Sequence, residues 1–556
     1  MVLGAGIAGL TGAALLARQG CSVVLLEAHH QSGGCAGTFR RGPYTFDAGA
    51  TQVAGFEQGG SHQRLFAELD VPLPRATALD PGCVVDLADG QPPVRIWRDP
   101  KRWRQERQQQ FPGSERFWQL CQRLHSSNWA FAARQPVLPP RNGWDLSQLL
   151  QAIGPGTVLS GLLSGATVAD LLRLCGCSGP GHQRLRRFLD LQLRLYSQEP
   201  ADRTAALYGV TVLAMVQEPL GLWHLHGSMQ ELSTSLETAL RQAGGELRLR
   251  HRVEKLQATG AGWLVQGVGP RGQSFSLEAA DVVCSLPPQG LPGLLGDQMP
   301  AGLQRRVESL GDPSGALVLY GAVARETLPA NCPAHLQLDW QQPGSLFISI
   351  SQEGDGRAPA GQATVIASVF TPARGWFELD PTAYQTAKAE AQRGIEAGLE
   401  QLLGLQERHW LHRELATPRG FARWTSRPFG FVGGIGQAPD RFGPFGLASR
   451  SPLAGLWLCG DAIYPGEGTA GVDRITTQPE PGKGAAARQA KGAKAIRRLT
   501  DAANKAKGAA CPAGKAARCG QLAVQPVAFF KAQQLLKARL NAPLRFGFGC
   551  CVGRWL

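Results

Sequence analysis

Gly4-Ala5-Gly6-Ile7-Ala8-Gly9 is the stretch that decides the fold, and Glu27 follows it at the end of an apolar run. In a strand–turn–helix unit, Gly4 allows the tight turn, Gly6 lets the backbone approach a pyrophosphate, and Gly9 lets the helix pack closely on the sheet. The N-terminus of such a helix attracts an anion. Glu27 stands where the second strand should end, so its carboxylate is expected to accept hydrogen bonds from a ribose. The sequence therefore predicts a site for FAD or NAD, because this carboxylate would repel a 2′-phosphate.

The surroundings of the glycine turn support a strand–helix–strand order. Apolar residues recur at helical spacing over 7–15, Gln19-Gly20 ends the helix, and 22–26 form an apolar run typical of a buried strand. Residues 1–3 alone remain for the first strand. We interpret this short start as an engineered end or a start site assigned too late.

Length and composition are those of an ordinary soluble chain. Its 556 residues are too many for one compact core, so two interleaved domains are expected. The composition is 43% hydrophobic and 18% charged residues. The sequence holds no run of about 18 apolar residues, and it opens on a nucleotide motif rather than a signal peptide. Its 13 cysteines are scattered without a CxxC pair, so reduced thiols in the cytoplasm are expected. The 11 histidines are equally dispersed, and no metal site is expected.

The net charge of +14 comes almost entirely from the C-terminal tail, residues 473–556. That tail holds 16 Lys and Arg against 3 Asp and Glu, whereas residues 1–472 hold 41 against 40. The body is therefore neutral, and nucleic acid is not an expected partner. The tail is rich in Gly, Ala, Lys and Arg, which predicts a low-complexity, disordered extension. Its segment 529–540 is alternatively one short basic helix that touches a membrane surface.

Further along the chain, two segments are expected to return to the nucleotide domain and three to build a second sheet. Residues 247–253 alternate like a half-exposed strand, and 281–285 form a short buried strand. The elements predicted for the second sheet and its covering helix are strands over 316–320, 346–350 and 364–370 and a helix over 381–405.

Three further segments make the nucleotide site specific for a flavin. After Glu27 come Ser32-Gly33-Gly34-Cys35-Ala36-Gly37 and then 46–51, where adjacent glycines let the backbone lie against a cofactor. Residues 225–232 lead into a helix, and 456–472 join a buried strand to a glycine-rich loop and the start of a helix.

In the order and spacing of these segments, the chain resembles the FAD-dependent carotenoid desaturases and carotenoid isomerases, within the flavin amine oxidase-like superfamily. The resemblance covers residues 1–472. Cys459-Gly460-Asp461 with the following 464–471 is most similar to the cyanobacterial carotenoid 3′,4′-desaturase branch. Residues 418–421 and 427–434 resemble the segment that precedes this loop in that group.

The resemblance implies an α/β fold in which a Rossmann-type FAD-binding domain, of the glutathione reductase and amine oxidase kind, carries an inserted substrate domain of mixed sheet plus helices. The expected FAD-binding domain is discontinuous, with residues 1–60, 225–290 and 430–472. The expected substrate and membrane-facing domain comprises 61–224 and 291–429, and the tail comprises 473–556.

The resemblance also implies which residues hold FAD. The expected contacts to the pyrophosphate and the adenosine are Gly4, Gly6 and Gly9 on the pyrophosphate, Glu27 on the ribose and the backbone of Val253 on adenine. The expected contacts to the rest of the cofactor are Gly33 and Gly34 on the diphosphate and ribityl region, Gly460 and Asp461 on the ribityl-diphosphate, and Gly471 and Val472 at the start of a helix aimed at the flavin pyrimidine ring. The dipole of that helix would stabilise an anionic reduced flavin.

Catalytic residues stay unassigned, because no acid/base pair or nucleophile accompanies these motifs. FAD itself carries the redox step: an allylic carbon gives up a hydride, a neighbouring carbon loses a proton, and the conjugated polyene stabilises the positive charge. Asp47, His224 and Tyr464 are candidates for a side-chain base. Thr51 either faces the flavin ring or belongs to a polar turn. The expected electron acceptor is oxygen or a membrane quinone.

The expected substrate is a hydrophobic polyene, because the inserted regions are apolar and helical. Apolar residues at helical spacing over 146–163 and 168–174 either line a lipid tunnel or form an ordinary core. Aromatic residues interleaved with Arg and Lys over 95–118 fit either a membrane interface or a solvated basic helix. The sequence thus predicts a cytoplasmic protein that is peripheral on a membrane.

Four functions are compatible with these features. The first is a desaturase acting near the end of an acyclic carotenoid, and the second is a carotenoid cis–trans isomerase that needs reduced FAD. An amine oxidase is disfavoured, because no covalent-flavin cysteine motif is evident. The fourth is a catalytically dead FAD- or carotenoid-binding protein, because 473–482 bring two prolines and a glycine where relatives continue a helix. Our hypothesis for this aberrant end is a frameshift after Val472, which resequencing of the gene tests.

Overall fold

The computed structural model describes residues 1–463 apart from 133, 135, 141, 155 and 217–220. The described residues belong to one compact unit, Met1–Thr476. Three of the sequence predictions therefore lie outside the described residues: the tail 473–556, the base candidate Tyr464 and the flavin-facing Gly471 and Val472.

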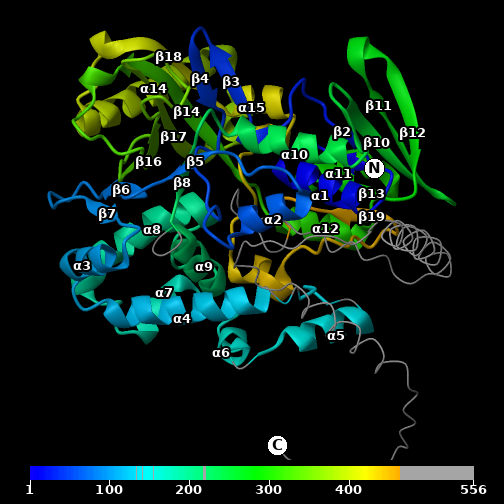
Figure 1. Ribbon diagram of the computed structural model, residues 1–556, viewed down its shortest axis with the longest axis horizontal. Helices are drawn as coiled ribbons and strands as arrows, with labels where there is room; N and C mark the ends of the chain where they lie inside the picture. Colours follow the sequence, from blue (N-terminus) through cyan, green and yellow to red (C-terminus); the bar gives the residue numbers. More distant parts are fainter. Residues whose placement is uncertain (133, 135, 141, 155, 217–220, 464–556) are drawn as a thin grey trace, which may run out of the picture. The chain divides into compact units, whose positions relative to one another are not determined.

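A parallel sheet of five strands confirms the predicted α/β nucleotide-binding fold. Its strands lie in the order β19-β13-β1-β2-β9, and every neighbouring pair is parallel. The strand bounds are β1 Val2–Leu3, β2 Val24–Leu26, β9 Glu246–Arg248, β13 Val282–Cys284 and β19 Leu456–Leu458. Helices α1 (Ile7–Arg18) and α10 (Gln230–Gln242) pack against each other, and their apolar residues share one core with Val2 and Leu25 (Figure 1). Segments from both ends of the described chain therefore meet in one sheet.

A second, antiparallel sheet shows that residues 247–253 are not one continuous strand. Arg250 adopts the left-handed conformation with φ of 59°, which ends β9 and turns the chain into the next strand. The three strands of this sheet are β10 Arg252–Thr259, β11 Gly262–Val268 and β12 Ser274–Ala279. Alternation of side chains cannot reveal such a turn, because it continues across the break.

The inserted mixed sheet has seven strands in the order β18-β14-β17-β16-β15-β6-β7. Strands β15 and β6 pair in parallel, and the other neighbouring pairs are antiparallel. The strand bounds are β6 Cys83–Asp86, β7 Val94–Ile96, β14 Ser314–Ala324, β15 His335–Leu338, β16 Leu346–Ile350, β17 Gln362–Pro372 and β18 Trp410–Ala416. The predicted long helix is α14 (Pro381–Leu403), which buries Ile395 and Leu399 against this sheet. The predicted strands of the second sheet are thus confirmed as β14, β16 and β17.

The remaining helices largely pack around β6 and β7, and they overturn the membrane-interface interpretation of residues 95–118. The helix bounds there are α3 Pro100–Gln110, α4 Glu115–Ala132, α5 Gly143–Ala152, α6 Thr157–Leu162, α7 Val168–Leu174, α8 Gln183–Ser197 and α9 Ala206–Val216. Trp103, Phe117 and Trp118 are buried in a core shared with α7, α8 and α9. The guanidinium of Arg107 lies 5.5 Å from the Trp103 ring, so the basic residues cover core aromatics.

Shorter elements complete the described chain. Their bounds are α2 Ser61–Leu69, α11 Leu291–Leu295, α12 Ala301–Ser309, α13 Gly375–Glu378, α15 Pro418–Thr425, β3 Thr38–Arg41, β4 Tyr44–Asp47, β5 Ala76–Ala78 and β8 Trp223–Leu225. Within the described ranges, the model contains no helix with the length and apolarity that a membrane crossing requires.

Candidate functional site

A cavity of about 2080 Å³ extends from the glycine turn after β1 to the helices α4, α5, α6 and α9. Its polar end is lined by the turn at Gly4 and Gly6, the loop 29–37 and the segment after β19. Its other end is lined by side chains of those helices, which are mostly apolar but include Asn128, Ser160 and Thr211. A pocket for one small ligand commonly measures about 300–1,000 Å³, so this space is large enough for more than one.

Glycine backbone forms one wall of the polar end. An added Cβ at Gly6 would meet no atom within 4 Å, so this glycine borders open space. Gly33 and Gly34 both have positive φ, and a Cβ on Gly34 would lie 3.3 Å from the Cα of Gly6. Helix α1 begins directly after Gly6 without a side-chain cap, which leaves its first N–H groups available to an anion. This cradle fits the pyrophosphate of a dinucleotide.

Gly9 has a different role from Gly6, because it faces the sheet. Its Cβ would stand 2.0 Å from the carbonyl oxygen of Gly4 and 2.7 Å from Ser285 Oγ. The Ser285 hydroxyl is itself held by the carbonyl oxygens of Leu3 and Gly4, at 2.8 and 2.9 Å. Gly9 therefore sets the close approach of helix and strand, as the motif predicted. Among the described residues of the cavity wall Gly9 is missing, and its assigned contact with the pyrophosphate stays a prediction.

Glu27 lines the cavity at the end of β2, where the sequence placed it. Its Oε2 accepts from the backbone N–H of Ala5 at 2.6 Å, and its Oε1 accepts from His29 N–H at 2.8 Å. Burial raises the pKa of this carboxyl, while these backbone donors act in the opposite direction. Each carboxylate oxygen keeps a further lone pair for a ribose hydroxyl.

An arginine that the sequence reasoning did not single out joins the two predicted halves of the site. Arg427 Nη2 donates to Asp461 Oδ2 at 2.9 Å and to the Gly433 carbonyl at 2.6 Å, while Nη1 lies 3.7 Å from Cys35 Sγ. Arg427, Cys35 and Asp461 all line the cavity. The signal for this residue was its place in the segment 427–434. Its charge is paired with Asp461, and its side chain lines the same cavity as Gly6 and Gly34.

Gly460 lies beside Asp461 in the cavity wall and has a φ of 121°, a conformation that favours glycine. Val253 does not belong to the wall formed by the described residues: it pairs with Gly267, next to a register shift that leads to Lys255. The assigned contact of Val253 with adenine stays a prediction.

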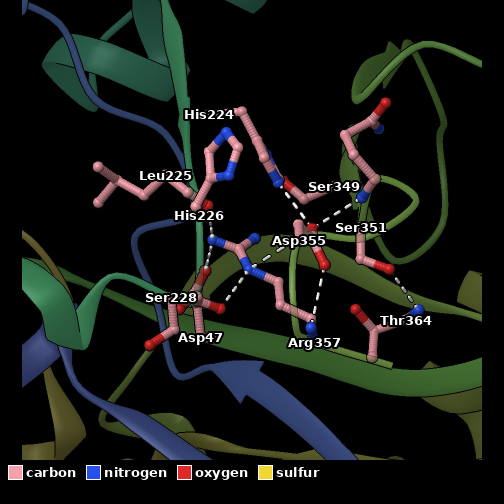
Figure 2. A network of polar contacts seen from close by, with 12 residues as sticks. Asp47, His224, Leu225, His226, Ser228, Ser349, Ser351, Asp355, Arg357 and Thr364 are labelled. Carbon is pink, nitrogen blue, oxygen red and sulfur yellow. Dashed lines mark hydrogen bonds and ion pairs between the residues drawn. The ribbon is translucent and has the colours of Figure 1, made fainter. Parts of the chain in front are cut away.

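Two of the predicted base candidates are buried in a network of charges instead of facing the cavity (Figure 2). Asp47 Oδ2 lies 3.2 Å from Arg357 Nη2, and its Oδ1 accepts from the Met229 N–H at 2.8 Å. His224 Nε2 lies 2.8 Å from Asp355 Oδ2. The network connects β4, the turn before α10 and the loop after β16, so its first role is structural.

Burial also fixes the protonation states in this network. Burial raises the pKa of Asp47, although Arg357 acts against it. Burial lowers the pKa of His224, while its contact with Asp355 acts in the opposite direction. At Asp355 burial acts to raise the pKa, but the hydrogen bonds from His224 and the Arg357 N–H keep it below its usual value.

Thr51 connects the cavity wall to a buried histidine. Its Oγ1 lies 2.6 Å from Ser349 Oγ, which lies 2.9 Å from His335 Nδ1. Burial holds the pKa of His335 well below its usual value, with the charge of Arg357 contributing. The structure thus places Thr51 at the cavity, with its hydroxyl hydrogen-bonded across to the inserted sheet.

The sequence left open whether the apolar segments 146–163 and 168–174 line a tunnel or form a core, and the structure shows both roles. Leu149, Ile153 and Val158 line the cavity. Leu171 and Leu172 belong to the core around β6 and β7. Among the described residues, no group of three or more His, Cys, Asp or Glu could hold a metal ion.

Comparison with known proteins agrees with this geometry. The sequence model of the family described as flavin containing amine oxidoreductase matches residues 7–471. Prolycopene isomerase of Arabidopsis thaliana is 24% identical over 498 residues, covering 85% of this chain and 80% of the isomerase. All-trans-retinol 13,14-reductase of Rattus norvegicus is 25% identical over 273 residues, covering 47% of this chain and 42% of the reductase.

Solved structures confirm the fold. An oxidoreductase from Methanosarcina mazei superimposes with a TM-score of 0.56 at 15% identity, covering 85% of this chain and 97% of that one. A triple mutant of putrescine oxidase gives a TM-score of 0.57 at 18% identity, covering 85% and 94%. At these identities the likeness concerns the fold alone.

Proposed function

Since the chain belongs to the flavin containing amine oxidoreductase family, we propose that it is an FAD-dependent carotenoid desaturase. In this proposal it removes two hydrogens from the 3′,4′ bond of an acyclic carotenoid. The cofactor follows from the family, in which FAD is the usual flavin. The choice of a desaturase rests on the resemblance of residues 459–461 and 464–471 to the 3′,4′-desaturase branch.

The proposal rests on one observation: a single cavity has a polar end and an apolar end. Its glycine and carboxylate end fits a dinucleotide. Its helical end offers Leu149, Ile153 and Val158, and among the described wall residues no charged side chain of α4, α5, α6 or α9 is present. A long apolar substrate whose reacting end reaches a flavin requires this combination. A charged amine would instead need a carboxylate partner at the helical end.

The residues divide the work accordingly. Gly4, Gly6 and the α1 N-terminus would hold the pyrophosphate, and Glu27 would hold the ribose. Gly33, Gly34, Gly460 and Asp461 would line the ribityl-diphosphate, with Arg427 neutralising its charge. The contacts assigned to Val253, Gly471 and Val472 remain predictions.

When bound, FAD supplies a hydride acceptor, and the second hydrogen leaves the substrate as a proton. The cavity wall contributes orientation and exclusion of water. For the proton we propose the route Thr51–Ser349–His335, whose hydrogen bonds measure 2.6 and 2.9 Å. A polyene cation is a strong acid, so a neutral histidine of low pKa suffices as acceptor. The proposed electron acceptor is oxygen or a membrane quinone.

A carotenoid cis–trans isomerase is the second candidate, because curated relatives that cover most of the chain are prolycopene isomerases. This reaction needs reduced FAD and leaves the substrate mass unchanged. A dead FAD- or carotenoid-binding protein is the third, on the ground of the aberrant sequence after Val472. Cytoplasmic location with peripheral membrane contact is part of the proposal.

The test is anaerobic mixing of the purified full-length protein, loaded with FAD, with an acyclic carotenoid in detergent. A desaturase bleaches the flavin absorbance near 450 nm in step with a product two hydrogens lighter (about 2 mass units). A product of unchanged mass that forms after prior reduction of the flavin identifies the isomerase. Bound FAD with no change in the pigment under either condition contradicts both activities.

A further inference from the structure

Helices α5 and α6 expose apolar side chains instead of burying them. We call their exposed residues the α5–α6 face: Leu146, Leu150 and Ile153 with Val158, Leu159 and Leu162. Leu162 is 80% exposed and Val158 is 63% exposed. Singly exposed leucines are ordinary, but a group on two consecutive helices is not.

The residues of the α5–α6 face carry no charge, and a cation that reaches them from outside is Arg134, whose Nη1 donates to the Ala152 carbonyl at 2.9 Å. Residues 146–169 contain no Asp, Glu, Lys or Arg. The nearest carboxylate, Asp145, is fully buried and accepts from Arg450 Nη1 at 2.8 Å, so its charge is directed away from solvent. A protein partner is usually recognised by a polar rim and hydrogen bonds around an apolar centre. A face with no charge along its helices fits a lipid surface better.

The same helices lead directly into the cavity. Ile153 and Val158 belong both to the face and to the cavity wall, and Leu149 and Gly161 line the cavity beside them. The apolar surface is therefore continuous from solvent to the inside of the site.

We propose that the α5–α6 face docks onto the surface of a lipid bilayer and forms the entrance through which an apolar ligand passes from lipid into the cavity. The docking follows from the face itself, whereas the passage of a polyene rests on the proposed function. In this arrangement Leu150, Leu159 and Leu162 enter the acyl region, and the Asp145–Arg450 ion pair joins α5 to the segment before β19. Because the face is uncharged, docking needs no anionic lipid.

The experiment is cosedimentation of the full-length protein with phosphatidylcholine vesicles at about 0.5 M salt, which suppresses binding through the basic residues of the tail. We expect the parent protein to bind, and the variant Leu159→Glu/Leu162→Glu to bind about a hundredfold more weakly, since each leucine is replaced by a charge. The control is Phe377→Glu/Leu411→Glu, which adds the same charges at exposed apolar residues outside the face. It should bind like the parent.

Three outcomes would overturn the proposal. Binding that requires anionic lipid and vanishes at high salt assigns the contact to basic residues. Equal loss in both double variants assigns it to charge alone. Failure to bind vesicles, together with a molecular mass that falls in Leu159→Glu/Leu162→Glu, assigns the face to a second copy of the chain. Since these measurements contain no carotenoid, they stand or fall independently of the desaturase reaction.

Discussion

The two ends of the cavity are built in opposite ways. At the polar end, the turn after β1 is hydrogen-bonded to Glu27 and Gly33, and Arg427 holds Asp461, so backbone and ion pairs fix the shape. At the apolar end, side chains of α4, α5, α6 and α9 form the wall, and some of them also face solvent. The polar end should therefore be intolerant of added atoms or lost charges. Substitutions at the apolar end should leave the stability of the fold unchanged and should alter which ligand binds there.

The largest expected effect comes from breaking the network behind the polar end. Arg357→Met leaves Asp47 buried without its cation and removes the hydrogen bonds from Arg357 to the carbonyls of Gly227 and Leu225. We expect a loss of about 3–5 kcal/mol in the free energy of unfolding, measured by urea denaturation. The control Arg374→Met removes a half-exposed pair with Asp312 and should cost less than about 1 kcal/mol. Equal losses in the two variants would show that the network carries no special weight.

The second prediction separates the glycines within one motif. Gly9→Ala places a methyl group 2.0 Å from a backbone oxygen, whereas Gly6→Ala meets no atom within 4 Å. We expect Gly9→Ala to lose about 3 kcal/mol of stability. Gly6→Ala should melt like the parent but bind FAD at least about tenfold more weakly, because its methyl group occupies the space of the pyrophosphate. Thermal melting without FAD and a titration of FAD fluorescence measure the two effects. Normal FAD affinity in Gly6→Ala would remove the pyrophosphate from this turn.

Such motif-level predictions succeed because their physical cause is local. A glycine turn between an apolar strand and a helix imposes its own geometry, and the structure places Gly4, Gly6 and Gly9 accordingly. The partnership of Asp47 with Arg357 has no local signature, since the two meet only when the inserted sheet folds against the turn before α10. No pattern in the sequence connects them.

Helical spacing predicted apolar faces but not what covers them. The aromatic residues over 95–118 fitted a membrane interface or a solvated basic helix, but Trp103, Phe117 and Trp118 are core. The apolar residues over 146–163 fitted a lipid tunnel or a core, and they are divided between the cavity wall and the exposed surface. Both segments have the same period, so only tertiary packing distinguishes them. The break between β9 and β10 at Arg250 was not predictable from the sequence pattern either. Arg250 has a positive φ, but no adjacent glycine signals a turn there.

The third prediction concerns α2, which gives both polar Arg64 and apolar Leu65 to the cavity wall. His62 in its first turn is buried, contacts the Ala54 carbonyl at 2.8 Å, and has a pKa lowered by burial to about 4. In the unfolded chain the pKa of His62 returns to about 6.5. Below that pH the unfolded state therefore binds a proton that the folded state does not bind. Stability should fall as the pH drops from 6.5 towards 4, by about 2 kcal/mol between pH 7 and pH 5.

Urea denaturation at these two pH values, for the parent and for His62→Gln, isolates this contribution. The variant keeps the other buried histidines, so the difference between the two pH slopes belongs to His62. If the slopes are equal, the histidine titrates in the folded protein, and the wall at α2 is more open to water than its burial indicates.

The smallest effect on folding is expected at the apolar end, where Gly161→Trp is the counterpart of Gly6→Ala. A Cβ at Gly161 meets nothing within 4 Å, and this glycine lines the cavity. The indole should enter that space, leaving stability and FAD affinity unchanged while weakening binding of a long carotenoid about tenfold. Gly165→Trp is the matched control. A Cβ at Gly165 also meets nothing within 4 Å, and Gly165 is not among the described residues of the cavity wall. Carotenoid binding followed by quenching of tryptophan fluorescence compares the two variants, which carry the same added fluorophore. Equal affinities would mean that the substrate does not pass α6, and the two ends of the cavity would then not serve two ligands.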